Sequence, residues 1–210
     1  ITNIQNVINR YKIETGRIEG LVKAGNDARA IDKVANINDT PALKGIDTLV
    51  KSIAMTRQGV DVKSTKTEIL TQMRAEMGFG GMIHNFKNYI LRLDKPRIEK
   101  VKTNVAKTRE AITLFRDLGI SLAEAKALDA IENVVTSYEA NLTKVETLGK
   151  MGKTPNEIDS VVKVNDDPAL RAMLKLVEKI ASESRYKRKT MTDSLSTVGL
   201  TAQFLMVMAI

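Results

Sequence analysis

Two stretches of this sequence match each other closely: IDKVANINDTPAL at residues 31–43 and IDSVVKVNDDPAL at residues 158–170. The match continues on both sides without a gap, so that residues 4–53 share 19 identities in 50 positions with residues 131–180. In each stretch Asn-Asp-x-Pro precedes apolar residues at helical spacing, which predicts a capped helix start with proline in the first turn. The sequence therefore predicts one helix–loop–helix hairpin that occurs twice, first from Ile4 and again from Ile131.

Apolar residues recur at helical spacing along nearly the whole chain, and glycine or proline marks the ends of the predicted helices. The first helix is expected to stop at Gly25, and a loop over residues 26–40 separates it from the next helix. Further helices are predicted at 67–93, 97–118, 122–148 and from Pro168 towards the C-terminus. These lengths predict an all-α fold of up-down four-helix bundles with long helices, in two stacked modules related by the internal repeat.

The repeat also divides the chain into two expected domains. Residues 1–62 contain the hairpin that is repeated at 131–180 and form a partial first helical module. Residues 63–210 form a complete second four-helix module. The first two helices of the first module either precede Ile1 or are replaced by long helices that serve both bundles. Residues 194–210 carry no charge, and we expect them to lead into a membrane span or to form a buried helix end.

Composition excludes several classes of function. The absence of Cys and the presence of one His argue against disulfide scaffolds and against most metal sites, so we expect no metal and no cofactor. The formal net charge of +8 is dispersed, and aromatic residues make up 4% of the chain, which disfavours nucleic-acid binding. No Glu-x-x-His pair and no Ser adjacent to the His is present, so the chain is not expected to be an enzyme.

The repeated loops carry polar residues whose expected role is structural. Asp32 and Asp159 occupy matching positions, as do Asn38 and Asn165. Short polar side chains of this kind hydrogen-bond nearby backbone and fix turns. A calcium site would require more carboxylates at closer spacing.

The least ordinary stretch of the chain is MGFGGMIHNFKNYILRL at residues 77–93. Glycine in a helix costs about 1 kcal/mol relative to alanine. Three glycines in four positions therefore need compensation, such as a close helix approach or room for a ligand. On a helical wheel the apolar residues of this stretch form one core stripe, made of Phe79, Met82, Ile83, Phe86, Ile90 and Leu93.

A second line of residues lies beside this core stripe and predicts a binding site. Gly80 would leave a notch one turn above His84 and Lys87, which supply two nitrogen donors, and Asn88 and Arg92 lie further round. Such a notch suits a small organic anion, most naturally a carboxylate. The alternative interpretation is that His84 is a packing residue and that Lys87 extends to solvent.

The run GFGGMIHNFKNYILR at residues 78–92, together with the two Asn-Asp-x-Pro-Ala-Leu hairpins, resembles the extracytoplasmic all-helical sensor domains of bacterial transmembrane receptors. Methyl-accepting chemotaxis proteins are the first such class, followed by sensor histidine kinases and diguanylate cyclases. The duplicated organisation is similar to the helical bimodular type, in which two stacked four-helix bundles bind small organic acids.

The resemblance implies a ligand-sensing domain in the periplasm, anchored in the cell inner membrane and acting as a homodimer. It also implies signalling by a helix displacement of about 1–2 Å. No ligand-binding residue is taken from the resemblance. The alternative of another class is a structural helical assembly protein.

Overall fold

The computed structural model describes residues 2–35, 37–38, 40–55, 65–78 and 80–208. Within these ranges the chain forms helices and their connections, which confirms the predicted all-α class for the described residues. The helices are α1 (Thr2–Lys23), α2 (Ala28–Val34), α3 (Thr40–Met55), α4 (Lys66–Met77), α5 (Met82–Arg92), α6 (Lys95–Asp117), α7 (Leu122–Lys150), α8 (Pro155–Val162) and α9 (Asp167–Met208).

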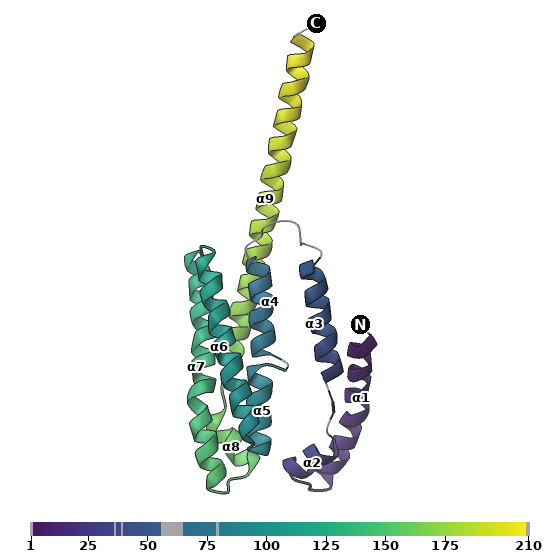
Figure 1. Cartoon of the computed structure of the whole chain (residues 1–210), viewed down its shortest axis with the longest axis vertical. Helices are drawn as coiled ribbons and strands as arrows, with labels where there is room; N and C mark the ends of the chain where they lie inside the picture. Colours follow the sequence, from purple (N-terminus) through teal and green to yellow (C-terminus); the bar gives the residue numbers. More distant parts are fainter. Residues whose placement is uncertain (1, 36, 39, 56–64, 79, 209–210) are drawn as a thin grey trace.

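Helices α4 to α9 pack around one apolar core. Helices α4 and α5 follow each other along one line, and α6 packs against both of them (Figure 1). Helix α7 packs between α6 and α9, and α9 also contacts α4. The largest fully buried side chains in this core include Met73, Met82, Phe86, Phe115, Leu128, Ile131, Tyr138, Ile158 and Leu176.

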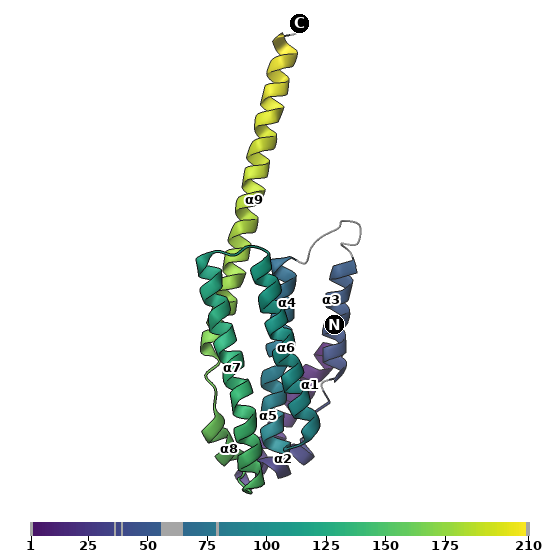
Figure 2. The ribbon, with the colours of Figure 1, turned by 60° about the vertical axis from the view of Figure 1, so that its left-hand side comes forward.

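Helices α1 and α3 form a separate pair beside this core. They pack against each other around the buried side chains of Val7 and Ala42. The short helix α2 joins the pair at one end and contacts both α5 and α8, as the turned view shows (Figure 2). Helix α9 extends beyond all the others at the opposite end of the molecule.

Local signals fix several helix ends where the sequence predicts them. Gly25 and Gly152 follow α1 and α7 with φ of 78° and 74°, a left-handed conformation that glycine adopts without strain. Asp94 caps α6, since its Oδ1 accepts the backbone N–H of Arg97 at 3.2 Å. The predicted bounds of α6 and α7 therefore agree with the structure to within two residues.

Two predicted connections contain short helices instead of loops alone. Helix α2 lies inside the expected loop at 26–40, where the Asp27 side chain accepts the N–H of Ala30 at 2.8 Å. Helix α8 follows Thr154, which forms a capping box with Glu157. Both helices are only seven or eight residues long, so their apolar period is too short to be recognised from sequence.

The remaining predictions concern the connection after α3 and the C-terminal helix. The predicted domain boundary between residues 62 and 63 lies outside the described residues. In the part of the chain that the structure describes, no helix combines the length and the apolar run that a membrane crossing requires.

Candidate functional site around helix α5

The glycine-rich run separates two helices. Gly80 has φ of 79°, and Gly81 is the N-cap of α5. The backbone N–H of Gly81 donates to the carbonyl oxygen of Gly78 at 3.0 Å, which closes a turn. The buried side chain of Asn85 donates to the carbonyl oxygens of Gly80 and Gly81 at 3.0 and 2.9 Å. The backbone N–H of Asn85 also donates to the carbonyl oxygen of Gly81 at 2.9 Å, so Asn85 ties the glycine turn to the start of α5.

This break corrects the prediction of one continuous helix over residues 67–93. Gly80 does not lie on the helical face of His84. Its backbone is left-handed and lies between two helices, so the 100° step of a helical wheel does not apply from Gly80 to His84. Leu43 of α3 packs where the notch was expected, and a Cβ atom on Gly80 would lie 2.7 Å from its Cδ2. The space beside Gly80 is thus occupied by Leu43, and Gly80 does not line the hollow described next. Phe79 lies outside the described residues.

Within α5 the helical wheel is correct for three members of the predicted core stripe, whereas Ile83 is half-buried and Leu93 follows α5 as its left-handed C-cap. Met82, Phe86 and Ile90 are buried in the core, as predicted. On the flank of this stripe lies an open hollow of about 500 Å³. Its lining residues are Gly78, Ile83, His84, Lys87, Asn88 and Leu91. Three of the five predicted site residues, His84, Lys87 and Asn88, therefore line one hollow, whereas Gly80 and Arg92 do not.

The two cationic residues of the predicted site are ion-paired to other helices. Lys87 Nζ pairs with Asp159 Oδ1 of α8. Arg92 forms a bidentate pair with Asp32 of α2, with N–O distances of 2.8 and 2.6 Å, and also donates to Asn88 Oδ1 at 2.8 Å. Helix α5 is thus held by one carboxylate from α2 and one from α8.

These contacts correct the expected role of Asp32 and Asp159, which occupy matching positions of the two repeated stretches. Both residues lie inside short helices, where the local N–H groups are bonded within the helix, so the carboxylates reach α5 instead. The prediction for the asparagines is confirmed. The side-chain oxygens of Asn38 and Asn165 accept the backbone N–H groups of residues 40 and 167, at 3.1 Å in each case.

Tyr138 connects α5 and α7 to the start of α9. Its ring meets Phe86 edge-on, with centroids 4.9 Å apart, and its hydroxyl donates to Asp166 Oδ1 at 2.7 Å. Burial, followed by the negative acceptor Asp166, raises the pKa of Tyr138 well above its ordinary value. Asn141 adds a bond to the carbonyl oxygen of Val162 at 3.1 Å. The segment between α8 and α9 is therefore anchored on α7.

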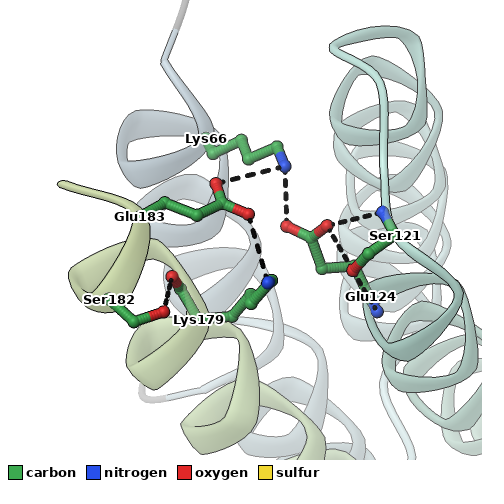
Figure 3. Close-up of polar contacts among 6 residues, drawn as sticks. All are labelled: Lys66, Ser121, Glu124, Lys179, Ser182 and Glu183. Atoms are coloured by element: carbon green, nitrogen blue, oxygen red, sulfur yellow. Dashed lines mark hydrogen bonds and ion pairs between the residues drawn. The ribbon is translucent and has the colours of Figure 1, made fainter. Parts of the chain in front are cut away.

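A second polar cluster lies at the opposite end, where α9 leaves the other helices (Figure 3). Lys66 Nζ of α4 lies 2.7 Å from Glu124 Oε1 of α7 and 3.7 Å from Glu183 Oε2 of α9. The Glu124 side chain is 1% exposed, and its other oxygen accepts the Ser121 backbone N–H and hydroxyl at 2.7 and 2.8 Å. The same ammonium group lies 5.6 Å from the centroid of the Phe115 ring.

The pKa of Glu124 follows from this environment. Burial raises it, but the hydrogen bonds from Lys66 and Ser121 and the charge of Lys66 together outweigh burial, so the pKa lies below its ordinary value. Glu124 is therefore an ionised carboxylate in the core, held by a cation on another helix. Sequence reasoning missed this cluster, although Ser-x-x-Glu at 121–124 is a recognisable capping-box signal.

A hollow of about 550 Å³ lies next to this cluster, between α7 and α9. Its lining includes side chains of both signs, among them Glu124, Glu178, Lys175 and Lys179. Two carboxylates, Glu124 and Glu178, line this hollow, whereas no Asp or Glu is among the described residues that line the hollow beside His84. The hollow beside His84 therefore suits an anion better.

Among the described residues, no group of three or more His, Asp or Glu side chains is arranged to hold a metal ion. Comparison with known protein families, with curated proteins and with solved structures finds no match to this chain.

Proposed function

We propose that this chain is the ligand-sensing domain of a bacterial transmembrane chemoreceptor and that it binds a small organic anion, a carboxylate, in the hollow beside α5. The observation that carries the proposal is that His84, Lys87 and Asn88 line one hollow of about 500 Å³. Pockets for small ligands have volumes of about 300–1,000 Å³. Imidazole N–H, ammonium and amide groups are the donors that a carboxylate requires.

The architecture that goes with this proposal is a duplicated one. In it, the α4–α5 line, α6, α7 and α9 form a four-helix bundle, and α1–α3 is the repeated half of a second module. The helix bounds support this, because the alignment that places Ile4 on Ile131 also brings matching helix ends together. The matching ends are Lys23 with Lys150, Ala28 with Pro155, and Thr40 with Asp167.

The proposal places the domain in the periplasm, anchored in the inner membrane and acting as a homodimer. The resemblance of residues 78–92 to receptor sensor domains supports this. A sensor domain of this kind would serve a histidine kinase or a diguanylate cyclase equally well. In each case ligand binding favours one of two packings of the helices over the other. The resulting displacement of α9 transmits the signal away from the site.

Ligand binding should stabilise the fold and depend on His84 and Lys87. At a hundredfold excess over Kd, a ligand that binds only the folded chain raises the free energy of unfolding by about 2.7 kcal/mol. We expect one or more of acetate, succinate, citrate and L-glutamate to raise Tm in a thermal-shift screen, with binding confirmed by calorimetry. His84→Ala and Lys87→Ala should abolish both effects, because each removes a donor to the anion.

The matched control is Lys126→Ala, which removes one exposed positive charge near the start of α7 that does not line the hollow. It should bind like the wild type. Equal loss of binding in the control variant, or unchanged binding in both site variants, would contradict the assignment of the site.

One observation favours a structural assembly protein as a second candidate. Among the large apolar side chains exposed on α1 and α3, four have counterparts in the second repeated stretch that are buried. The exposed ones are Ile8, Tyr11, Ile46 and Leu49, and the buried ones are Val135, Tyr138, Met173 and Leu176. A homodimer and an open assembly would both cover this face. Sedimentation equilibrium separates a closed dimer from species that grow with concentration.

A further inference from the structure

We propose that Asp159 is an internal competitor for the ligand: its carboxylate occupies Lys87, and a bound carboxylate takes its place. This inference rests on the proposed function of the hollow beside α5. Its structural basis is that Lys87 both lines that hollow and pairs with Asp159 of α8. A carboxylate ligand that reaches Lys87 therefore competes with the carboxylate of Asp159 for the same ammonium group.

The two ion pairs on α5 differ in how readily a ligand could replace the protein carboxylate. The side chains of Lys87 and Asp159 are 48% and 43% exposed and share a single contact, so water and salt screen their attraction. The side chains of Arg92 and Asp32 are 24% and 21% exposed and form a bidentate pair, which is the stronger and more directional arrangement. We therefore expect the ligand to displace Asp159 from Lys87, whereas the ion pair between Asp32 and Arg92 of α5 remains.

The position of Asp159 makes this exchange consequential for α9. Helix α8 ends at Val162, and only residues 163–166 separate it from the first residue of α9. Loss of the Lys87–Asp159 pair removes a direct ion pair between α5 and α8, while Tyr138 still holds Asp166. Through α8, the exchange thus changes how firmly the N-terminal end of α9 is held. Helix α9 is the one that extends past the rest of the molecule (Figure 1).

The substitution Asp159→Asn tests the inference, because it removes the competing charge and preserves size. Exposed ion pairs contribute up to about 1 kcal/mol, so we expect binding about fivefold tighter than in the wild type. The probes are acetate, succinate, citrate and L-glutamate, titrated by calorimetry. The matched control is Asp129→Asn, which removes an acid of the same kind from an exposed ion pair between Arg116 of α6 and α7. The affinity of Asp129→Asn for these anions should equal that of the wild type.

Hydrogen exchange of residues 155–162 provides a second readout. In the wild type, exchange in α8 should increase when the ligand displaces Asp159. In Asp159→Asn it should already be raised, and ligand should add little. Wild-type binding with no gain in affinity for Asp159→Asn, or with unchanged exchange in α8, would overturn the inference and leave the proposed function intact. Failure of both proteins to bind any of the four anions would overturn both.

Discussion

Replacement of Lys66 by methionine is expected to lower the free energy of unfolding by about 3 kcal/mol, measured by urea denaturation followed by circular dichroism. The reason is that Glu124 is 1% exposed and would remain in the core without its counter-ion. Methionine retains the apolar stem, so the loss of packing is small. Glu183 retains Lys179 as a partner at 3.7 Å, so its contribution should change little.

The double variant Lys66→Met, Glu124→Gln is the control for this prediction. Glutamine keeps an oxygen that can accept the Ser121 backbone N–H and removes the buried charge. We therefore expect the double variant to be more stable than Lys66→Met alone. Equal stability of the two would show that the buried charge does not cause the loss.

The sign of the pH dependence gives an independent check on the same pair. In the wild type the pKa of Glu124 is below its ordinary value, so its contribution is present above about pH 4.3 and is lost as the pH falls through the folded pKa. In Lys66→Met burial remains and the lowering by Lys66 is gone, so the pKa should rise. The stability deficit of the variant should therefore be largest at pH 7 and shrink as the pH approaches 4.

The substitution Gly81→Ala is expected to destabilise the protein by about 3 kcal/mol, at the upper end of the range for overpacking. An added Cβ atom would lie 2.3 Å from the carbonyl oxygen of Glu76 and 2.5 Å from that of Ala75. Both atoms belong to the backbone of α4, so they cannot turn away as a side chain would. Loss of this turn would also disturb the bonds that Asn85 makes to the backbone of Gly80 and Gly81.

Gly20→Ala provides the matched control, because Gly20 lies within α1 and an added Cβ there meets nothing within 4 Å. Alanine is the better helix former, so this variant should gain up to about 1 kcal/mol. Opposite signs for the two substitutions are the expected result. A loss at Gly81 no larger than the change at Gly20 would contradict the packed break between α4 and α5.

The features predicted correctly from sequence are those with local causes. Gly25 and Asp94 mark helix ends because capping depends on residues within one turn. His84, Lys87 and Asn88 share a hollow because residues three and four apart share a helical face.

The failures have physical causes of two kinds. Gly80 was misplaced because a helical wheel assumes an unbroken helix, and the backbone at Gly80 is left-handed. The Arg92–Asp32 and Lys66–Glu124 pairs join residues 60 and 58 positions apart. Nothing in the local sequence pairs such distant charges, because tertiary packing decides which helix faces meet.

The imidazole of His84 offers the most direct measurement of the proposed carboxylate site. His84 is the only histidine of the chain, so its Cε1–H resonance in a proton–carbon NMR spectrum needs no assignment. We predict that a carboxylate that raises Tm shifts this resonance in a saturable manner, and that Lys87→Ala abolishes the shift. A stabilising carboxylate that saturates the protein and leaves the His84 resonance unmoved would contradict this prediction.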